Sequence, residues 1–307
     1  MDPENLCREQ LELVHEFDPA AQSDGKGVHT FTIAESPTGS GYVGFAGPVM
    51  DGPIDRWTST NLETWQRTPR TPVLERSKLR WPTVLWEDGD LFMVARGAHR
   101  GPIAKLQTYV RRAKGKIPGL EATEPMRIDL YRSEDGRKFS RQQELVGPDQ
   151  TGFPYNRNPF LFRDPVSNQI GLLYYTGTFS HFEIRLRLAN DVPGLVDGGE
   201  AVLVESDKIL AAPALWYDDE AGEYMLFCET FDESSNVWAT DVFRSAEMRQ
   251  GFDVHTGTRI FSDNRACAFP YEFEGQLYIT VSHCTGDVGY GGIDSQWIGE
   301  IYRCPAD

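Results

Sequence analysis

The chain has 307 residues and a formal net charge of −16, with 46 acidic and 30 basic side chains. This acidity argues against a nucleic-acid partner, because binding to phosphates needs a basic face. No apolar run is long enough to span a bilayer, and the charged N-terminus has no apolar signal-peptide core. We therefore expect a cytoplasmic protein with no membrane partner.

Only seven of the basic residues are Lys, so Arg dominates. An acidic surface that is poor in Lys suits a salt-rich cytoplasm, where dense carboxylates keep a protein soluble, although a GC-rich genome produces the same bias. A halophilic protein is therefore a hypothesis. The five cysteines are scattered and form no CxxC pair, which predicts reduced, buried thiols.

A hairpin pattern recurs five times along the chain. Each copy has a short apolar run, a turn rich in Gly, Asp, Glu or Ser, and a second apolar run. The third copy, NPFLFRDPVSNQIGLLYYTG at residues 158–177, is the clearest. The copies begin near residues 31, 82, 159, 213 and 268. A repeat of this length predicts a propeller or another array.

A second pattern follows at residues 56–65, 130–139 and 242–252, where a strand, a Ser, a turn and an aromatic residue come in that order. Two hairpins per repeat give four strands, which is one propeller blade. We therefore predict an all-β fold, a five-bladed β-propeller with four antiparallel strands per blade, as a single domain over residues 1–307. The last blade is one strand short, so residues 11–17 are predicted to supply that strand and close the ring.

One segment interrupts the repeat. Residues 97–123 separate the two hairpins of blade two and are rich in Lys and Arg, and residues 103–113 could form a helix. Two interpretations stay open. The segment is either a solvated basic helix or oligomer contact, or it is a lid over the central face, because it follows the end of an inner strand.

Propeller geometry sorts the candidate residues. In each blade the first strand begins, and the second strand ends, at the mouth of the central channel, whereas the hairpin tips lie on the opposite face. Asp88, Asp164, Asp218 and Asp219 lie at predicted tips, so turn formation explains these acids.

The residues expected at the channel mouth combine cations, imidazoles and aromatic rings with few carboxylates. Aromatic rings stack on sugars, charged groups bind hydroxyls, and Arg suits anionic ligands. The predicted substrate-binding residues are Arg80, Trp81, Arg96, His99, Tyr155, Arg157, Asn158, His181, Arg265 and His283. The histidines come from separate blades without ligand spacing, so we predict neither a metal site nor a cofactor.

The repeat of Pro, aromatic strand, acidic turn and LYY-like strand, followed by a Ser, a turn and an aromatic residue, resembles glycoside hydrolase family 43 and its five-bladed relatives. These include arabinanases, xylosidases, invertase-like enzymes and mannoside phosphorylases. The resemblance covers nearly the whole chain and is specific for architecture rather than for substrate. It implies a propeller with a pocket on the axis and cleavage of glycosidic bonds.

Family 43 places three carboxylates at the starts of innermost strands: an Asp base in blade one, a positioning Asp in blade three and a Glu acid in blade four. The matching positions here are Thr30, Asn158 and Ala212, and none is acidic. Arg163-Asp164-Pro165 spells the RDP motif of invertase-like relatives, but it follows a strand instead of preceding one. The resemblance therefore carries over the fold and not the usual catalytic trio.

Glycoside hydrolysis normally uses two carboxyl groups that flank the bond. The best remaining acid is Glu229, which ends the strand YMLFC, where apolar surroundings would raise its pKa for general-acid work. A salt bridge to a nearby Arg is the alternative role. Asp232 or Asp287 is its candidate partner, and His29 is a candidate base, because imidazole titrates near neutral pH.

Two hypotheses for function follow. The first is a glycoside hydrolase-like enzyme that acts on a small or anionic glycan in the axial pocket. The second is a non-catalytic carbohydrate-binding propeller that lacks the carboxylate trio. A protein-interaction propeller is less favoured, because the Gly-His and Trp-Asp signatures of WD repeats are absent from the sequence.

Overall fold

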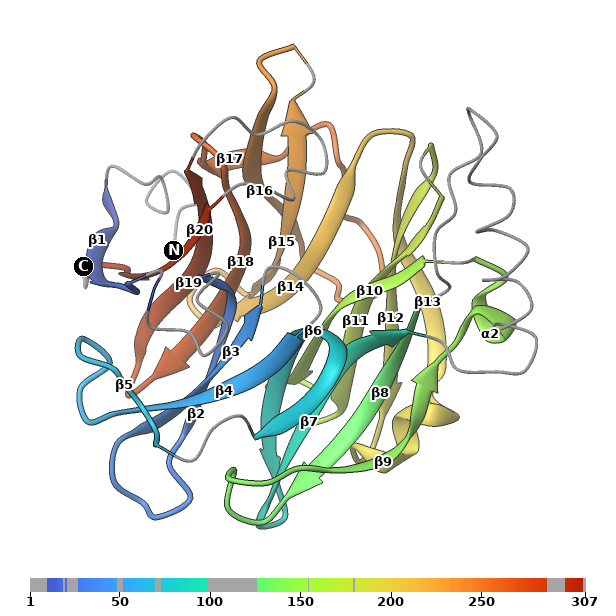
Figure 1. The fold of residues 1–307 in the computed structure, drawn as a ribbon. Helices are drawn as coiled ribbons and strands as arrows, with labels where there is room; N and C mark the ends of the chain where they lie inside the picture. The colour runs from blue at the N-terminus through green and yellow to red at the C-terminus, as the bar shows by residue number, and fades with distance from the viewer. Residues whose placement is uncertain are drawn as a thin grey trace, which may run out of the picture.

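The computed structural model describes residues 10–18, 20, 27–48, 52–69, 73–98, 126–153, 155–178, 180–232, 234–285 and 296–305. Strands dominate these ranges, and helices α2 (Pro148–Thr151) and η4 (Pro193–Val196) have four residues each. Figure 1 shows the sheets following one another around the molecule in chain order. The predicted all-β, five-bladed propeller is confirmed.

Each blade is an antiparallel sheet of four strands. Blade one has β2 (Val28–Glu35), β3 (Tyr42–Pro48), β4 (Gly52–Ser59) and β5 (Gln66–Arg67), and blade two has β6 (Leu74–Glu87), β7 (Asp90–Ala98), β8 (Met126–Ser133) and β9 (Ser140–Val146). Blade three has β10 (Tyr155–Arg163), β11 (Ile170–Gly177), β12 (Phe182–Ala189) and β13 (Gly199–Ser206), and blade four has β14 (Leu210–Asp218), β15 (Glu223–Asp232), β16 (Val237–Ser245) and β17 (Thr258–Phe261). Blade five has β18 (Arg265–Phe273), β19 (Gln276–Thr285), β20 (Gln296–Arg303) and β1 (Glu12–Glu16).

The fifth sheet takes strands from both ends of the sequence. β1 pairs antiparallel with β20, with Glu12 opposite Arg303, and the guanidinium of Arg303 lies 2.6 Å from the Glu12 carboxylate. In Figure 1 the blue β1 lies beside the red β20. Blades one and two are also joined directly, because β4 pairs with β6 as well as with its own neighbours.

The second strand of blade three, β11, is apolar along most of its length because it is buried. β11 is buried at all eight positions, because its sheet is covered by neighbouring blades on both faces. Alternation of polar and apolar residues, which marks a half-exposed strand, is therefore lost. Aromatic rings fill the space between blades: Phe160 of β10 and Phe269 of β18 stack with centroids 5.7 Å apart.

The first strands begin several residues earlier than the sequence predicted, and each contains a register shift close to the predicted start. Proline cannot donate to the strand ladder, so Pro82, Pro159 and Pro213 read as strand starts, whereas the structure places each of them inside a β-bulge. At the bulges of blades two to five one residue has a positive φ, which is strained for a side chain other than glycine. These residues are Trp81, Asn158, Ala212 and Cys267, with φ of 51°, 49°, 43° and 55°.

Threonine hydroxyls connect neighbouring blades to one another. The Thr83 hydroxyl donates to the Pro159 carbonyl at 3.2 Å and accepts from the Leu161 amide at 3.1 Å, which links blades two and three. The Thr280 hydroxyl donates to the Phe31 carbonyl at 2.7 Å and links blades five and one. These bonds satisfy buried backbone groups that no strand neighbour reaches.

The acids at hairpin tips have the turn role that the sequence predicted. Asp164 accepts hydrogen bonds from the amides of Val166 and Ser167 at 3.3 and 2.7 Å, and it also accepts one from the Tyr224 hydroxyl of blade four at 2.9 Å. Asp218 accepts from the amides of Glu220 and Ala221. The RDP sequence is therefore a turn that also ties two blades together.

Two further predictions concern segments of which the structure describes only a part. Cys228, Cys267, Cys284 and Cys304 are buried and form no disulfide with one another, as predicted, and Cys7 lies outside the described residues. The basic insertion at residues 97–123 is described only at its first two residues, so its predicted helix and lid lie outside them. In the described part of the chain, no helix is long and apolar enough to cross a membrane.

Candidate active site

The candidate site is built from the starts of the first strands. β2, β6, β10, β14 and β18 each contact the next first strand around the molecule. The second strand of each blade runs antiparallel to the first, so its last residues lie beside those starts. The bulges of the first strands lie in the same region and re-aim side chains, as bulges near active sites commonly do.

One side of the site is an aromatic and cationic cluster from blades one, two and five. The His29 ring has its centroid 4.5 Å from that of Trp297 and 6.2 Å from that of Trp81. The guanidinium carbons of Arg80 and Arg96 lie 5.7 and 5.3 Å from the Trp81 centroid, which is cation–π distance. Trp81 therefore forms an apolar surface flanked by two positive charges.

Several polar atoms in this cluster are buried without a hydrogen-bond partner among the described residues. They are His29 Nδ1, Thr30 Oγ1 and Trp81 Nε1. Burial, with the positive charge of Arg80, lowers the pKa of His29 to about 3. The imidazole is therefore neutral near pH 7, and it suits hydrogen bonding to a ligand better than proton abstraction, which needs a pKa near the working pH.

Glu229 ends the apolar part of β15 and lies against blade five. Cys267 Sγ is 2.9 Å from Glu229 Oε2, and the thiol donates this hydrogen bond. Burial raises the Glu229 pKa, while the Cys267 hydrogen bond and the positive charge of Arg157 lower it in part. Burial and the neighbouring carboxyl group raise the pKa of the Cys267 thiol well above its usual value, so the thiol stays protonated. Glu229 therefore has the environment of a carboxylic acid that keeps its proton at higher pH than usual.

Arg157 supplies a third cation from blade three. Its guanidinium carbon lies 4.6 Å from the Tyr155 centroid, and its Nε lies 2.8 Å from the Met126 sulfur. Within the described residues Arg157 forms no ion pair, although its charge acts on Glu229. Asn158, the next residue, is at the strained bulge position of β10. Arg157 is therefore available to a negatively charged group at the axis.

Arg265 and His283 belong to a buried network in blade five. The Arg265 guanidinium donates to both oxygens of Glu300, at 2.8 and 3.0 Å, and His283 Nδ1 lies 3.0 Å from Glu300 Oε1. The Tyr302 hydroxyl donates to the same carboxylate at 2.8 Å. The charge of Arg265 is thus balanced inside the protein, which indicates a supporting role for this pair.

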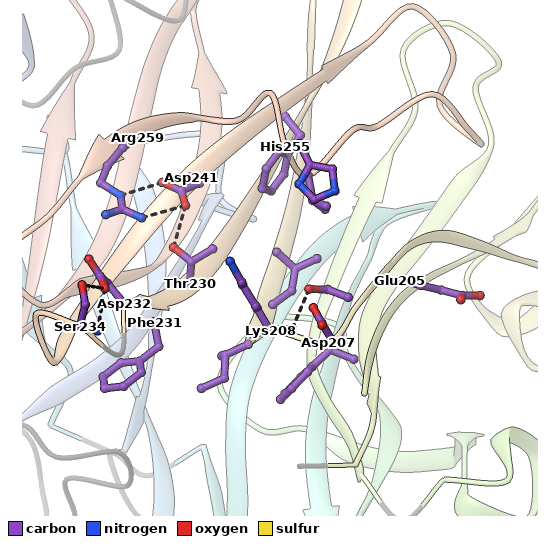
Figure 2. Close-up of a pocket in the computed structure, with 16 residues that line it drawn as sticks. Glu205, Asp207, Lys208, Thr230, Phe231, Asp232, Ser234, Asp241, His255 and Arg259 are labelled. Atoms are coloured by element: carbon purple, nitrogen blue, oxygen red, sulfur yellow. Dashed lines mark hydrogen bonds and ion pairs between the residues drawn. The ribbon is translucent and has the colours of Figure 1, made fainter. Parts of the chain in front are cut away.

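The remaining predicted site residues fall into three places. His181 lies 2.9 Å from a Glu183 oxygen at the start of β12, in a cluster with Arg185. Asp232 accepts hydrogen bonds from the Ser234 hydroxyl and from the Ser234 and Ser235 amides at a turn, and these bonds lower its pKa to about 2. Figure 2 shows Asp232 beside a pocket, and Glu229 is not among the residues that line this pocket. His99 and Asp287 lie outside the described residues, so their predicted roles stay predictions.

Sequence reasoning missed Cys267 and Trp297 as parts of the site. The sequence places Cys267 at a strand start near the channel mouth, at the position that matches Asn158 and Ala212, but it predicts only a buried thiol without a role in the site. That alignment is the signal that pointed to it. Trp297 follows residues outside any hairpin repeat, and no local pattern brings it to His29.

Comparisons with known proteins agree with this geometry at the level of the fold. No family model matches the sequence, and no curated protein matches it. Solved structures do. A thermostable family-43 glycoside hydrolase superposes with a TM-score of 0.68 at 12% identity, covering 92% of this chain and 90% of that one. The α-L-arabinanase of Cellvibrio cellulosa, complexed with arabinohexaose, gives 0.63 at 12% identity, with 92% and 93% coverage.

A family-32 β-fructofuranosidase from Bombyx mori, in complex with sucrose, is also similar, with a TM-score of 0.62 at 13% identity. The match covers 92% of this chain and 62% of the fructofuranosidase. This protein is therefore a β-propeller of the five-bladed type found in glycoside hydrolase families 43 and 32. The resemblance noted in the sequence is confirmed for the fold.

Proposed function

We propose that this protein is a glycosidase-type enzyme that binds the anionic end of a glycan at the propeller axis, with Glu229 as its general acid. The observation that carries the proposal is the environment of Glu229: a partly exposed carboxyl group at the axis, with a raised pKa and a single described hydrogen-bond partner, Cys267. A protonated carboxyl group in this position can donate its proton to the oxygen of a leaving sugar.

The cations around the axis support an anionic sugar. Arg80 and Arg96 flank Trp81, and Arg157 approaches from blade three, whereas Glu229 is the one candidate acid that the described residues bring to this cluster. A guanidinium group binds a carboxylate with two parallel hydrogen bonds, and the Trp81 face stacks on the apolar side of a sugar ring. A uronic acid matches both features.

Glycoside hydrolysis also uses a second carboxyl group. Asp232 is held in a turn by the amides that follow it, so Asp287 is the better candidate for a partner. His29 is neutral near pH 7 and is assigned to binding a sugar hydroxyl. Location in a salt-rich cytoplasm also stays a prediction.

A second function is favoured by one specific observation. The positions at which family 43 carries its acids are Thr30, Asn158 and Ala212 in this chain, and two of them occupy strained bulges without a carboxylate. A propeller that binds the glycan without cleaving it would keep the cations and Trp81 and need no acid pair.

Glu229→Gln separates these functions. The change keeps the shape and removes the titrating proton. For the enzyme, turnover of p-nitrophenyl glycosides, including the glucuronide and galacturonide, should fall about 10²–10⁴-fold, while calorimetric affinity for the free uronic acids is kept. The matched control is Glu134→Gln, which makes the same substitution at an exposed glutamate of blade two, directly after β8. If wild-type protein binds uronic acids and turns over no glycoside, the binding-only function is correct.

A further inference from the structure

A buried arginine between blades one and two has no role in the function proposed so far. Arg56 of β4 is only 8% exposed, and its Nε makes no hydrogen bond within the described residues. In the same part of the chain its guanidinium group forms no ion pair. An unpaired charge in a protein interior is strongly unfavourable, so this cation is expected to have a counterion.

The strand places the Arg56 side chain in the space between the two blades. Successive side chains of a strand point to opposite faces, and Ile54, two residues earlier, packs in the core that blades one and two share. On the blade-two side, Gly136 lies in the turn from β8 to β9, and a Cβ atom added to it would be 3.8 Å from Arg56 Nε and 3.4 Å from Cζ of Phe45. Arg56 is therefore packed under this turn, next to apolar side chains.

The charges near Arg56 leave it unbalanced. Burial lowers the Arg56 pKa and the positive charge of Arg137 lowers it further, whereas the negative charge of Asp135 raises it by less. The Asp135 carboxylate already accepts a hydrogen bond from the Arg137 amide, at 2.9 Å. Asp55, the preceding residue of β4, lies on the other face of the strand and pairs with Arg67 at 3.7 Å. Two guanidinium groups therefore lie near a single carboxylate, which its own turn holds.

This place is at the opposite end of blade two from the candidate active site. β7 begins beside the end of β8, where Leu91 pairs with Ser133, and it ends beside the start of β8, where Ala98 pairs with Met126. Met126 contacts Arg157 of the candidate site. β8 has eight residues, and a strand advances about 3.3 Å per residue, so its two ends lie more than about 20 Å apart. Figure 1 shows the turn from β8 to β9 at the lower end of blade two.

We propose that Arg56 and Arg137 bind a small oxyanion, a phosphate or a carboxylate, at the junction of blades one and two. Guanidinium groups form strong, charge-assisted hydrogen bonds with the oxygens of both groups. Because Arg56 keeps only 8% of its surface exposed, the site admits a small ion, or the end of a ligand whose remainder stays in solvent. The bound anion pairs the buried charge and links β4 to the turn of blade two. The site is independent of the proposed glycosidase activity.

Two variants and two probes test the site. Arg56→Met removes the buried charge and keeps an unbranched side chain between the blades, and Arg137→Ala removes an exposed charge. Arg249→Ala is the control, because Arg249 is exposed in the equivalent turn of blade four, after β16. Sodium phosphate and sodium acetate are titrated by calorimetry and in melting curves, with sodium chloride at equal ionic strength as the reference, so that general screening cancels.

We expect the wild type and Arg249→Ala to bind phosphate or acetate with the same affinity, and the better probe distinguishes a phosphate ligand from a carboxylate ligand. Arg56→Met should lose this binding, and Arg137→Ala should weaken it about tenfold or more, the effect of one lost charge-assisted contact. Without either probe, Arg56→Met should melt no lower than the wild type, because its unpaired buried charge is gone.

Three results would overturn the proposal. The first is a wild type that binds neither probe. The second is wild-type affinity for the better probe in Arg137→Ala or in folded Arg56→Met. The third is a much lower melting temperature of Arg56→Met without either probe, which would show that Arg56 is already stabilised without a bound anion.

Discussion

The sulfur of Cys267 lies 2.9 Å from Oε2 of Glu229, so a residue of blade five holds the carboxyl group that blade four presents at the axis. Cys267 reaches it from a backbone conformation with φ of 55°, at the bulge of β18. A side chain in this region of φ costs about 1–3 kcal/mol. The same bulge position carries Trp81 and Asn158 in other blades, so the strain recurs where the candidate site residues gather.

Cys267 should tune the pH range of the proposed acid. Its hydrogen bond lowers the Glu229 pKa, so Cys267→Ala should raise that pKa further. A general acid works while it is protonated, and the alkaline limb of kcat against pH should therefore move to higher pH. Cys267→Ser restores a donor and should move the limb back toward the wild type.

A pH profile of kcat for the three proteins checks this prediction. Cys304→Ala, which removes a buried thiol elsewhere in blade five, is the control for general loss of packing. An alkaline limb that stays in place in Cys267→Ala would show that the thiol only fills space.

Glu300 should make the fold sensitive to acid. Burial opposes its ionisation, but hydrogen bonds from His283, Arg265 and Tyr302 outweigh burial and bring its pKa to about 2, from an ordinary value of 4.5. The ionised form is thus favoured by folding. Its contribution is fully present above pH 4.5 and is lost as pH falls toward 2, and it amounts to roughly 3 kcal/mol at 1.36 kcal/mol per pKa unit.

Urea unfolding between pH 7 and pH 2.5 measures this contribution. Glu300→Gln leaves the Arg265 charge buried without its partner and should cost about 3–5 kcal/mol at pH 7. The variant should also lose less stability than the wild type on acidification. Equal acid sensitivity in both proteins would assign the effect to other carboxylates.

The hydroxyl of Tyr224 should stabilise the junction of blades three and four. It donates to the buried carboxylate of Asp164 at 2.9 Å, and hydrogen bonds to charged groups contribute about 1.5–3 kcal/mol. Tyr224→Phe should therefore lower the free energy of unfolding by about that amount. Tyr217→Phe is a matched control, because Tyr217 packs 4.8 Å from Tyr224 and its hydroxyl makes no hydrogen bond within the described residues. Similar losses for both variants would contradict the prediction.

The acidic surface should make the protein more stable in salt. Its net charge of −16 implies repulsion between surface carboxylates, and at 1 M salt the Debye length is about 3 Å, which screens that repulsion. We expect the melting temperature to rise from low to molar NaCl. A flat or falling curve would remove the halophilic hypothesis.

The repeat of hairpins could be recognised from local signals in the sequence. Turn residues such as Asp164 and Asp218, together with apolar runs on either side, are local signals, because a hairpin is formed by neighbours in the chain. Counting those hairpins was enough to predict five blades of four strands. The same repeat also predicted which residues lie at the strand starts and ends. These residues were expected at the axis, because equivalent positions of each blade meet there.

The contacts between residues of different blades depend on tertiary packing. Cys267 reaches Glu229, and Trp297 reaches His29, across boundaries between blades that no periodic pattern spans. The pKa of His29 also depends on burial and on Arg80 of the next blade. The ordinary pKa of imidazole suggested a general base, but in the folded protein the His29 pKa is too low for that role. Hairpin signals depend on neighbours in sequence, whereas the site depends on contacts that exist only after the blades have packed around one axis.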